Sequence, residues 1–268
     1  MSDLEEKQQT PEFLIGPAKN YSTLKPAAIV FVSIALYNAF ELVLLIPLSF
    51  RRYRSLYFWA LLTSTVLGVI PMALGPTLQL FELAPLWLVM VLSNVGFVAM
   101  VPNQSVVLYS RLHLVSQREL ILVFVRWLIF FSLLAIVIPT IVLNVGSSYT
   151  PQSSEWVRGY NAIERIQLTW FSVQEGLISS VYIWETVRMI KLSPEEDKRR
   201  RMVLYELFAI NVTAIIMDLS LVILEYLGFY FAQIILKATL YSIKLKMEFA
   251  VLGMLVWIVR SHNSGPTL

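Results

Sequence analysis

Long stretches without any charged residue limit the fold of this chain more than any other feature. Two of them cover residues 55–81 and 83–110. A helix needs about 20 apolar residues to cross the hydrocarbon core of a bilayer, and both stretches exceed that length. Of the 268 residues, 57% are hydrophobic and 15% are charged, and the mean hydropathy is +0.68. This composition excludes an ordinary soluble domain and predicts an all-α polytopic membrane protein.

The apolar runs and the breaks between them predict a bundle of seven transmembrane helices. The predicted spans are residues 27–50, 55–80, 85–109, 120–143, 162–188, 202–226 and 229–259. The chain then divides into a polar N-terminal tail (1–25), a membrane domain (26–260) and a short C-terminal tail (261–268). The tail lacks the pattern of a cleaved signal peptide, so we expect the first span to direct insertion. Pro71, Pro102 and Pro139 fall inside spans and are expected to kink them.

Basic residues are divided unequally between the two ends of these spans, which predicts the orientation. The larger group comprises Arg51, Arg52, Arg54, Arg111, Arg118, Arg188, Lys191, Lys198, Arg199, Arg200, Arg201 and Arg260. The smaller group comprises Lys7, Lys19, Lys25 and Arg158. The positive-inside rule places the larger group in the cytosol, so the N-terminus lies outside and the C-terminus is cytosolic. The sequon at Asn20 then lies on the outer side, where glycosylation takes place.

Polar and charged side chains also recur within the predicted spans. A charge at the bilayer centre costs about 2.5–3.5 kcal/mol on insertion scales, so such residues usually face the bundle interior and serve a function there. Asn211, Asp218 and Glu225 recur every seven residues and share one helical face. The last span carries a second stripe, formed by Lys237, Tyr241, Lys244 and Glu248. Lys244 and Glu248 have the i,i+4 spacing of an ion pair.

The first and fifth spans add further polar groups. They are Asn38, Glu41, Gln167, Gln174 and Glu175. Of all these residues, Asn38, Asn211 and Lys244 are predicted to belong to a polar core. A plainer interpretation is that they only join helices, at about 0.6 kcal/mol for each hydrogen bond. Residues nearer the span ends are expected to extend their charges into the interface: Glu164, Arg165, Glu185, Glu225 and Lys237.

Several classes of site are excluded by composition. The chain has no cysteine, so disulfides, thiolate catalysis and cysteine metal sites are ruled out. Its two histidines, His113 and His262, fall outside the predicted spans, and we expect neither a metal nor another cofactor. The net charge of +3 is too small to indicate nucleic-acid binding.

Carboxylic acids in apolar surroundings suggest one kind of chemistry. Such a group stays protonated near neutral pH and can protonate an olefin or open an epoxide. The candidate catalytic acids are Glu41, Asp218, Glu175 and Glu248. Aromatic rings at similar depth, such as Phe40 and Trp170, would stabilise a carbocation. The same rings also suit ordinary packing.

Seven spans with an outside N-terminus are also typical of receptors. The outer connections at 81–84 and 227–228 are too short for a peptide vestibule. A retinal protein would use Lys244, but the third span carries no carboxylate as a counter-ion. A transporter is not indicated, because the chain shows no inverted repeat. An orphan receptor or membrane sensor therefore stays open as the alternative to an enzyme.

Three segments carry a family resemblance: YNAFEL (37–42), YSRLHLV (109–115) and KLKMEFAVLG (244–253). They resemble a family of fungal seven-helix integral membrane proteins of unknown function. A looser similarity is to membrane-bound terpene cyclases of fungal meroterpenoid pathways, in which Phe40-Glu41 would match an aromatic-acid pair and Asp218 a second acid. That resemblance implies acid-initiated cyclisation of a hydrophobic prenylated small molecule in the endoplasmic reticulum or another endomembrane.

The alternative is a seven-helix orphan receptor or sensor without enzymatic activity, located in the plasma membrane. Residues 191–201 would then contact a cytosolic partner. A simpler explanation is that this charged loop fixes the orientation of the bundle. Either way, the lipid bilayer is the expected environment.

Overall fold

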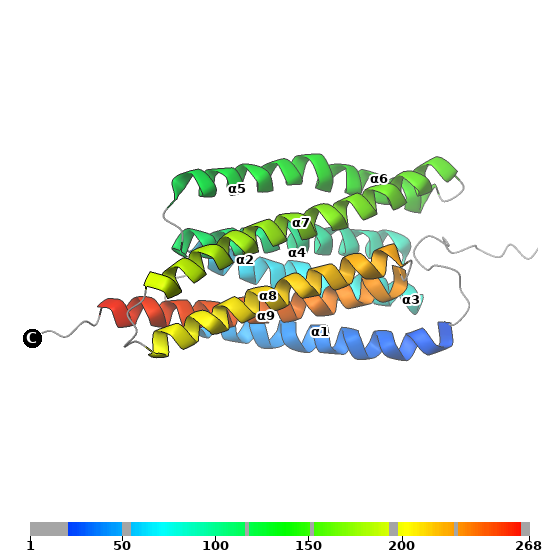
Figure 1. Cartoon of the computed structure of the whole chain (residues 1–268). Coiled ribbons are helices and arrows are strands. Elements are labelled where there is room, and N and C mark those ends of the chain that lie inside the picture. Colours follow the sequence, from blue (N-terminus) through cyan, green and yellow to red (C-terminus); the bar gives the residue numbers. More distant parts are fainter. Residues whose placement is uncertain are drawn as a thin grey trace, which may run out of the picture.

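The computed structural model describes residues 21–49, 55–115, 118–150, 153–192, 198–227 and 230–263, and their regular structure is helical throughout (Figure 1). They form seven helical rods. Five rods are single helices: α1 (Tyr21–Ser49), α4 (Leu86–Val115), α7 (Ser154–Leu192), α8 (Lys198–Tyr226) and α9 (Tyr230–Asn263). The other two each join two α-helices through a π-helical turn. They are α2–η1–α3 (Leu56–Thr63, Ser64–Val69, Ile70–Leu80) and α5–η2–α6 (Glu119–Ser132, Leu133–Val137, Ile138–Tyr149).

Each rod covers nearly all of one of the seven predicted spans, so the helical part of the prediction is confirmed. Within the described ranges, five stretches are long and apolar enough to cross a membrane. They are Lys25–Ser49, Leu56–Leu80, Leu86–His113, Glu119–Tyr149 and Met202–Tyr226. The remaining rods, α7 and α9, carry more charged residues along their length. The protein is therefore a multi-pass membrane protein with at least two rods of mixed polarity.

The two π-helical turns explain how prolines fit inside long rods. Pro71 and Pro139 each lie two residues after the end of a π turn. A proline has no N–H to donate and its ring crowds the preceding turn, so a regular α-helix cannot continue unchanged through it. At the first site the Ile70 N–H instead donates to the Thr65 carbonyl, five residues back. Two of the three prolines that were predicted to kink their spans thus follow a wider turn.

Local signals also account for the tight connection between α3 and α4. Phe81 ends α3, and Glu82 takes a φ of 54°, a left-handed conformation that is uncommon outside glycine. The Leu83 N–H donates back to the Leu78 carbonyl at 3.0 Å and so caps α3. This short turn brings α4 directly alongside α3.

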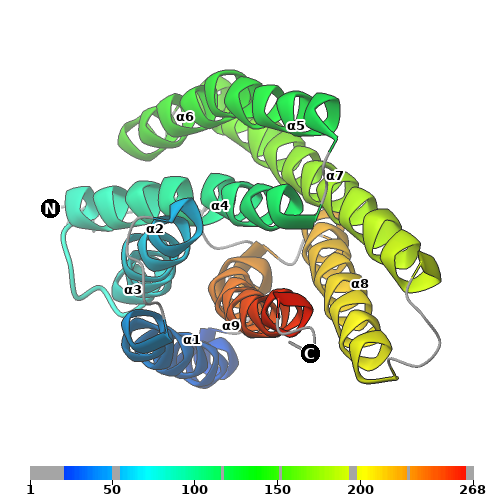
Figure 2. The ribbon, with the colours of Figure 1, turned by 90° about the vertical axis from the view of Figure 1, so that its left-hand side faces the viewer.

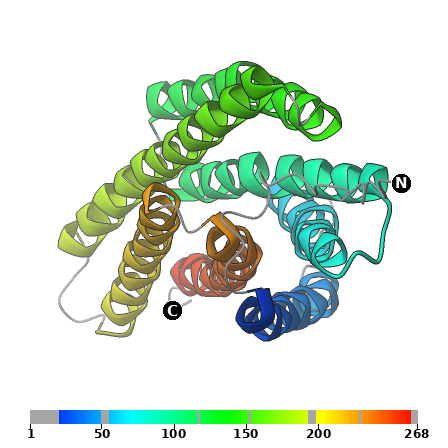
Figure 3. The same ribbon diagram turned by 90° about the vertical axis from the view of Figure 1, so that its right-hand side faces the viewer.

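The last helix, α9, lies in the middle of the bundle. Views along the rods show it enclosed by α1, α2–α3, α4 and α8, whereas α5–α6 and α7 form the side of the bundle beyond α4 (Figures 2 and 3). Large apolar side chains on α5 point away from the bundle, including Phe124, Trp127 and Phe131, which are 57–64% exposed. These outward rings are what a lipid-facing surface requires.

Close packing of α3 on α4 depends on small residues. A Cβ atom at position 96 would lie 2.6 Å from the backbone nitrogen of Met72 and 2.9 Å from its Cα. Helices in membranes often use glycine in this way to bring two backbones together. Gly96 therefore sets the distance between α3 and α4.

We expect Gly96→Ala to destabilise the bundle, because the added methyl group meets backbone and not a movable side chain. Overpacking of this kind typically costs about 1–3 kcal/mol. Gly176→Ala on α7 is the matched control, since a Cβ at that position meets nothing within 4 Å. Thermal melting of the two variants in nanodiscs measures the difference. Equal melting temperatures would show that α3 and α4 can separate without loss.

Candidate functional site

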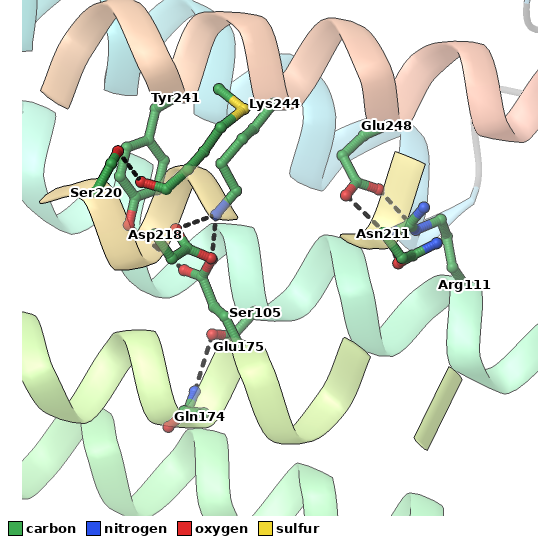
Figure 4. Close-up of polar contacts among 11 residues, drawn as sticks. Ser105, Arg111, Gln174, Glu175, Asn211, Asp218, Ser220, Tyr241, Lys244 and Glu248 are labelled. Carbon is green, nitrogen blue, oxygen red and sulfur yellow. Dashed lines mark hydrogen bonds and ion pairs between the residues drawn. The ribbon is translucent and has the colours of Figure 1, made fainter. Parts of the chain in front are cut away.

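A buried ion triad joins three helices near the middle of the bundle (Figure 4). The Lys244 ammonium on α9 donates to the Glu175 carboxylate on α7 and to Asp218 Oδ1 on α8, the latter at 2.6 Å. The Tyr241 hydroxyl also donates to Glu175 Oε1, at 3.4 Å. All four side chains are buried. One cation faces two carboxylates, so the triad is electrically neutral only when it also holds one proton.

A chain of uncharged polar groups leads from this triad toward α5. Gln174, next to Glu175, donates to Ser105 Oγ on α4 at 2.9 Å. Its amide oxygen accepts from Ser132 of α5, which in turn accepts from the indole N–H of Trp170 at 2.8 Å. These bonds satisfy groups that have no access to water. They fix α7 between α4 and α5.

A second buried ion pair lies one helical turn further along α9 (Figure 4). Arg111 of α4 approaches Glu248 with two nitrogens, Nε at 2.6 Å from Oε2 and Nη2 at 2.7 Å from Oε1. Nη2 is also 3.4 Å from Asn211 Oδ1 on α8, and the guanidinium carbon stands 5.2 Å from the centre of the Tyr182 ring. The contact between Nη2 and Oε1 is a charge-assisted hydrogen bond, whereas Nε and Oε2 form an ion pair without hydrogen-bond geometry.

These contacts overturn the predicted pairing of Lys244 with Glu248. The two residues share one face of α9, but Lys244 turns to carboxylates on α7 and α8, and Glu248 turns to Arg111. A cation between two facing carboxylates is better compensated than one held by a single neighbour on its own helix. Arg111 was assigned to the cytosolic flank, yet it is 1% exposed and lies inside the bundle.

The first helix contributes less to the core than predicted. Asn38 is buried and donates to Ser242 Oγ on α9 at 3.2 Å, as a polar core residue would. Glu41 instead pairs with Lys246 at 2.5 Å, with about a third of its side chain exposed. Phe40 beside it is 65% exposed. The Phe40-Glu41 pair therefore lies at the outside of the bundle.

A cavity lies in the half of the bundle that holds the N-terminal end of α9. Its volume is about 70 Å³, and it opens toward solvent. Its lining comes from α3, α4, α6, α7 and α9. The polar side chains from α7 and α9 are Glu164, Gln167, Gln233 and Lys237. None of the four candidate catalytic acids lines it.

Several residues predicted to reach the interface are instead drawn inward. Glu225 and Lys237 are 0% and 5% exposed, and Glu185 is 6% exposed. Glu225 lies 3.8 Å from Arg165 Nε, so its charge has a partner at the bundle surface. The predictions for Glu225, Lys237 and Glu185 were wrong because helices on several sides cover these ends of α7, α8 and α9.

The predicted stripe on α8 is confirmed. Asn211, Asp218 and Glu225 are 1%, 5% and 0% exposed, so the whole face is turned inward. Sequence reasoning missed Gln104 and Arg111, which lie seven residues apart on α4 and are both buried. That spacing within an apolar run was the available signal. The Asn20 sequon and residues 193–197 of the proposed partner segment lie outside the described residues.

In the part of the chain that the structure describes, no group of three or more His, Asp or Glu side chains is arranged to hold a metal ion. A sequence-family model described as a domain of unknown function (DUF7703) matches residues 22–265, which cover all seven rods. No curated protein and no solved structure matches the chain.

Proposed function

This chain belongs to the DUF7703 family, a domain of unknown function, and we propose that it is a seven-span membrane receptor or sensor without enzymatic activity. In this proposal the cavity receives a signal at the outer side, and α9 transmits it toward the cytosol. All seven rods span the bilayer, with the N-terminus outside.

One observation carries the proposal: a single central helix connects the cavity to both buried ion clusters. Lys237 lines the cavity, Lys244 belongs to the triad and Glu248 pairs with Arg111. Their spacings of seven and four residues place all three on one face of α9. At 1.5 Å per residue, the stripe extends about 16 Å along the helix axis. A shift of α9 at the cavity would therefore also move Lys244 in the triad and Glu248 in its pair with Arg111.

Buried ion pairs suit such a role better than they suit stability. The free energy needed to remove two ions from water is about as large as the free energy that their attraction contributes. The best-attested role of a buried ion pair is therefore to select one arrangement of the helices among several. Lys244 has carboxylates on two different helices, α7 and α8. A small movement of α9 would change the balance between these two partners, which gives the bundle two discrete states.

The test measures the position of α9 at its far end when the cavity is changed. Because the chain has no cysteine, spin labels at Met202→Cys on α8 and Gly253→Cys on α9 are unique. Met202 is 64% exposed, and a Cβ at position 253 meets nothing within 4 Å. We expect Lys237→Met to move the label-to-label distance by about 2 Å or more, or to add a second population.

Lys25→Met, at an exposed site near the start of α1, is the matched control and should leave the distance unchanged. Lys244→Met should shift the distance in the same way as Lys237→Met, because both act on α9. Identical distance distributions in the wild type and the three variants would mean that α9 does not move when the cavity changes. The sensor proposal would then be wrong.

The proposed topology rests on the basic residues and on one structural agreement. Arg118 before α5 and Arg188 near the end of α7 both lie 3.8 Å from Glu185, so these two members of the cytosolic group share one end of the bundle. Reporter fusions after positions 54, 118, 201 and 268 are expected to read cytosolic. Two or more readings on the opposite side would overturn this orientation.

Terpene cyclisation is the second candidate, and one observation favours it. Glu164 lines the cavity together with the Phe97 and Tyr160 rings, which is the combination of acid and aromatic faces that the chemistry needs. Feeding farnesylated phenols, with and without a terminal epoxide, to a host that expresses the chain tests it. A cyclised product that disappears in Glu164→Gln would replace the sensor proposal with an enzyme.

A further inference from the structure

We propose that the cavity binds a small zwitterion, a molecule that carries an ammonium group and an acidic group a few bonds apart. The proposal deepens the sensor function, on which it rests, by assigning the chemical class of its ligand. The site consists of Glu164 and Gln167 on α7 and Gln233 and Lys237 on α9.

These four side chains are buried or half-buried, and one of them, Gln233, has no hydrogen-bond partner. Gln233 is 0% exposed, and neither its amide nitrogen nor its amide oxygen has a hydrogen-bond partner. Lys237 stands 5.5 Å from the Phe97 ring and forms no ion pair with a described residue. Gln167 and Glu164 line the same cavity from α7. Native proteins satisfy nearly all buried polar groups, so the orphaned Gln233 amide at this cavity indicates a bound molecule.

The charges select the class of molecule. Lys237 and Glu164 line the cavity from two helices and feel each other's charge without forming an ion pair, and Glu225 acts on both of them. A buried charge needs both an opposite charge and hydrogen bonds. An acidic group against Lys237 and an ammonium group against Glu164 supply both, whereas a neutral polyol would supply hydrogen bonds alone.

The amides and the apolar wall complete the fit. Gln167 and Gln233 each offer a donor and an acceptor, which match the remaining sites on an ammonium and an acid. Met72, Met90 and Phe97 line the same cavity and provide an apolar surface for a hydrocarbon part. A free apolar amino acid and the headgroup of an ethanolamine phospholipid share this chemistry.

The experiment separates these two sources. Full-length protein in phosphatidylglycerol nanodiscs is titrated with leucine and phenylalanine by calorimetry, and N-acetyl-leucine, which lacks the ammonium group, is the ligand control. In a second arm, native mass spectrometry compares retention of phosphatidylethanolamine with that of phosphatidylglycerol. We expect binding in one arm, weakened at least tenfold by Lys237→Met and by the nearly isosteric Glu164→Gln.

Lys25→Met is the matched control and should bind as the wild type does. Melting temperatures of the variants identify any that fail to fold, and Gln167→Leu provides a third probe that removes no charge. If neither the amino acids nor phosphatidylethanolamine bind the wild type more tightly than the Glu164→Gln variant, the cavity holds only water. The zwitterion proposal is then wrong. The spin-label distances are measured without added ligand, so the sensor proposal would survive that result if Lys237→Met still moves α9.

Discussion

Lys244→Met is expected to cost about 3–5 kcal/mol of folding free energy, because it leaves two buried carboxylates without their cation. Lys244 is 1% exposed, and its two partners, Glu175 and Asp218, are 1% and 5% exposed. Methionine preserves the length of the side chain, so the loss comes from charge and not from a cavity. Reversible unfolding of the reconstituted protein, followed by tryptophan fluorescence, measures the difference.

The neutral triad provides the control for this prediction. Adding Glu175→Gln and Asp218→Asn to Lys244→Met removes all three ionisable groups, and most of the lost stability should return. Lys25→Met, which removes an exposed cation, should have a much smaller effect. If Lys244→Met unfolds like the wild type, then the two carboxyls are already neutral without the lysine.

Arg111→Met should produce a loss of similar size, about 3–5 kcal/mol, at the other ion cluster. The substitution leaves Glu248 buried at 2% exposure and removes the guanidinium from the Tyr182 ring. Thermal melting of the reconstituted variant checks this, with Arg158→Met on the exposed start of α7 as the control. Adding Glu248→Gln to Arg111→Met should recover part of the loss. An unchanged melting temperature in Arg111→Met would show that Glu248 needs no cation.

The rods were predictable because lipid solvation leaves little freedom in how a span is built. A backbone in hydrocarbon must satisfy its hydrogen bonds within the segment, so apolar length alone indicates a helix. The α8 stripe was predictable for a related reason. Asn211, Asp218 and Glu225 share a face, and only the interior accepts three such groups. Helices and inward faces follow from local sequence.

The ion-pair partners could not be predicted from the sequence, because spacing fixes the helical face of a residue but not which helix packs against that face. Lys244 and Glu248 were one turn apart, and nothing in α9 showed that α4, α7 and α8 would offer better partners to each. Arg111 was misplaced for a different reason. Counting basic residues near span ends treats each one as solvated, whereas α4 continues to Val115 and holds Arg111 inside.

The central position of α9 has a consequence for how the protein is made. The ribosome synthesises α9 after the other six rods, yet it supplies the cation for Glu175 and Asp218 and the carboxylate for Arg111. Until α9 arrives, a nascent chain already in the membrane carries these charges unpaired, because domains assemble as they emerge. Those six rods would lack the partners that α9 gives to Arg111, Glu175 and Asp218. We therefore expect a chain whose translation stops before Tyr230 to be removed by quality control and not to act as a shorter working protein.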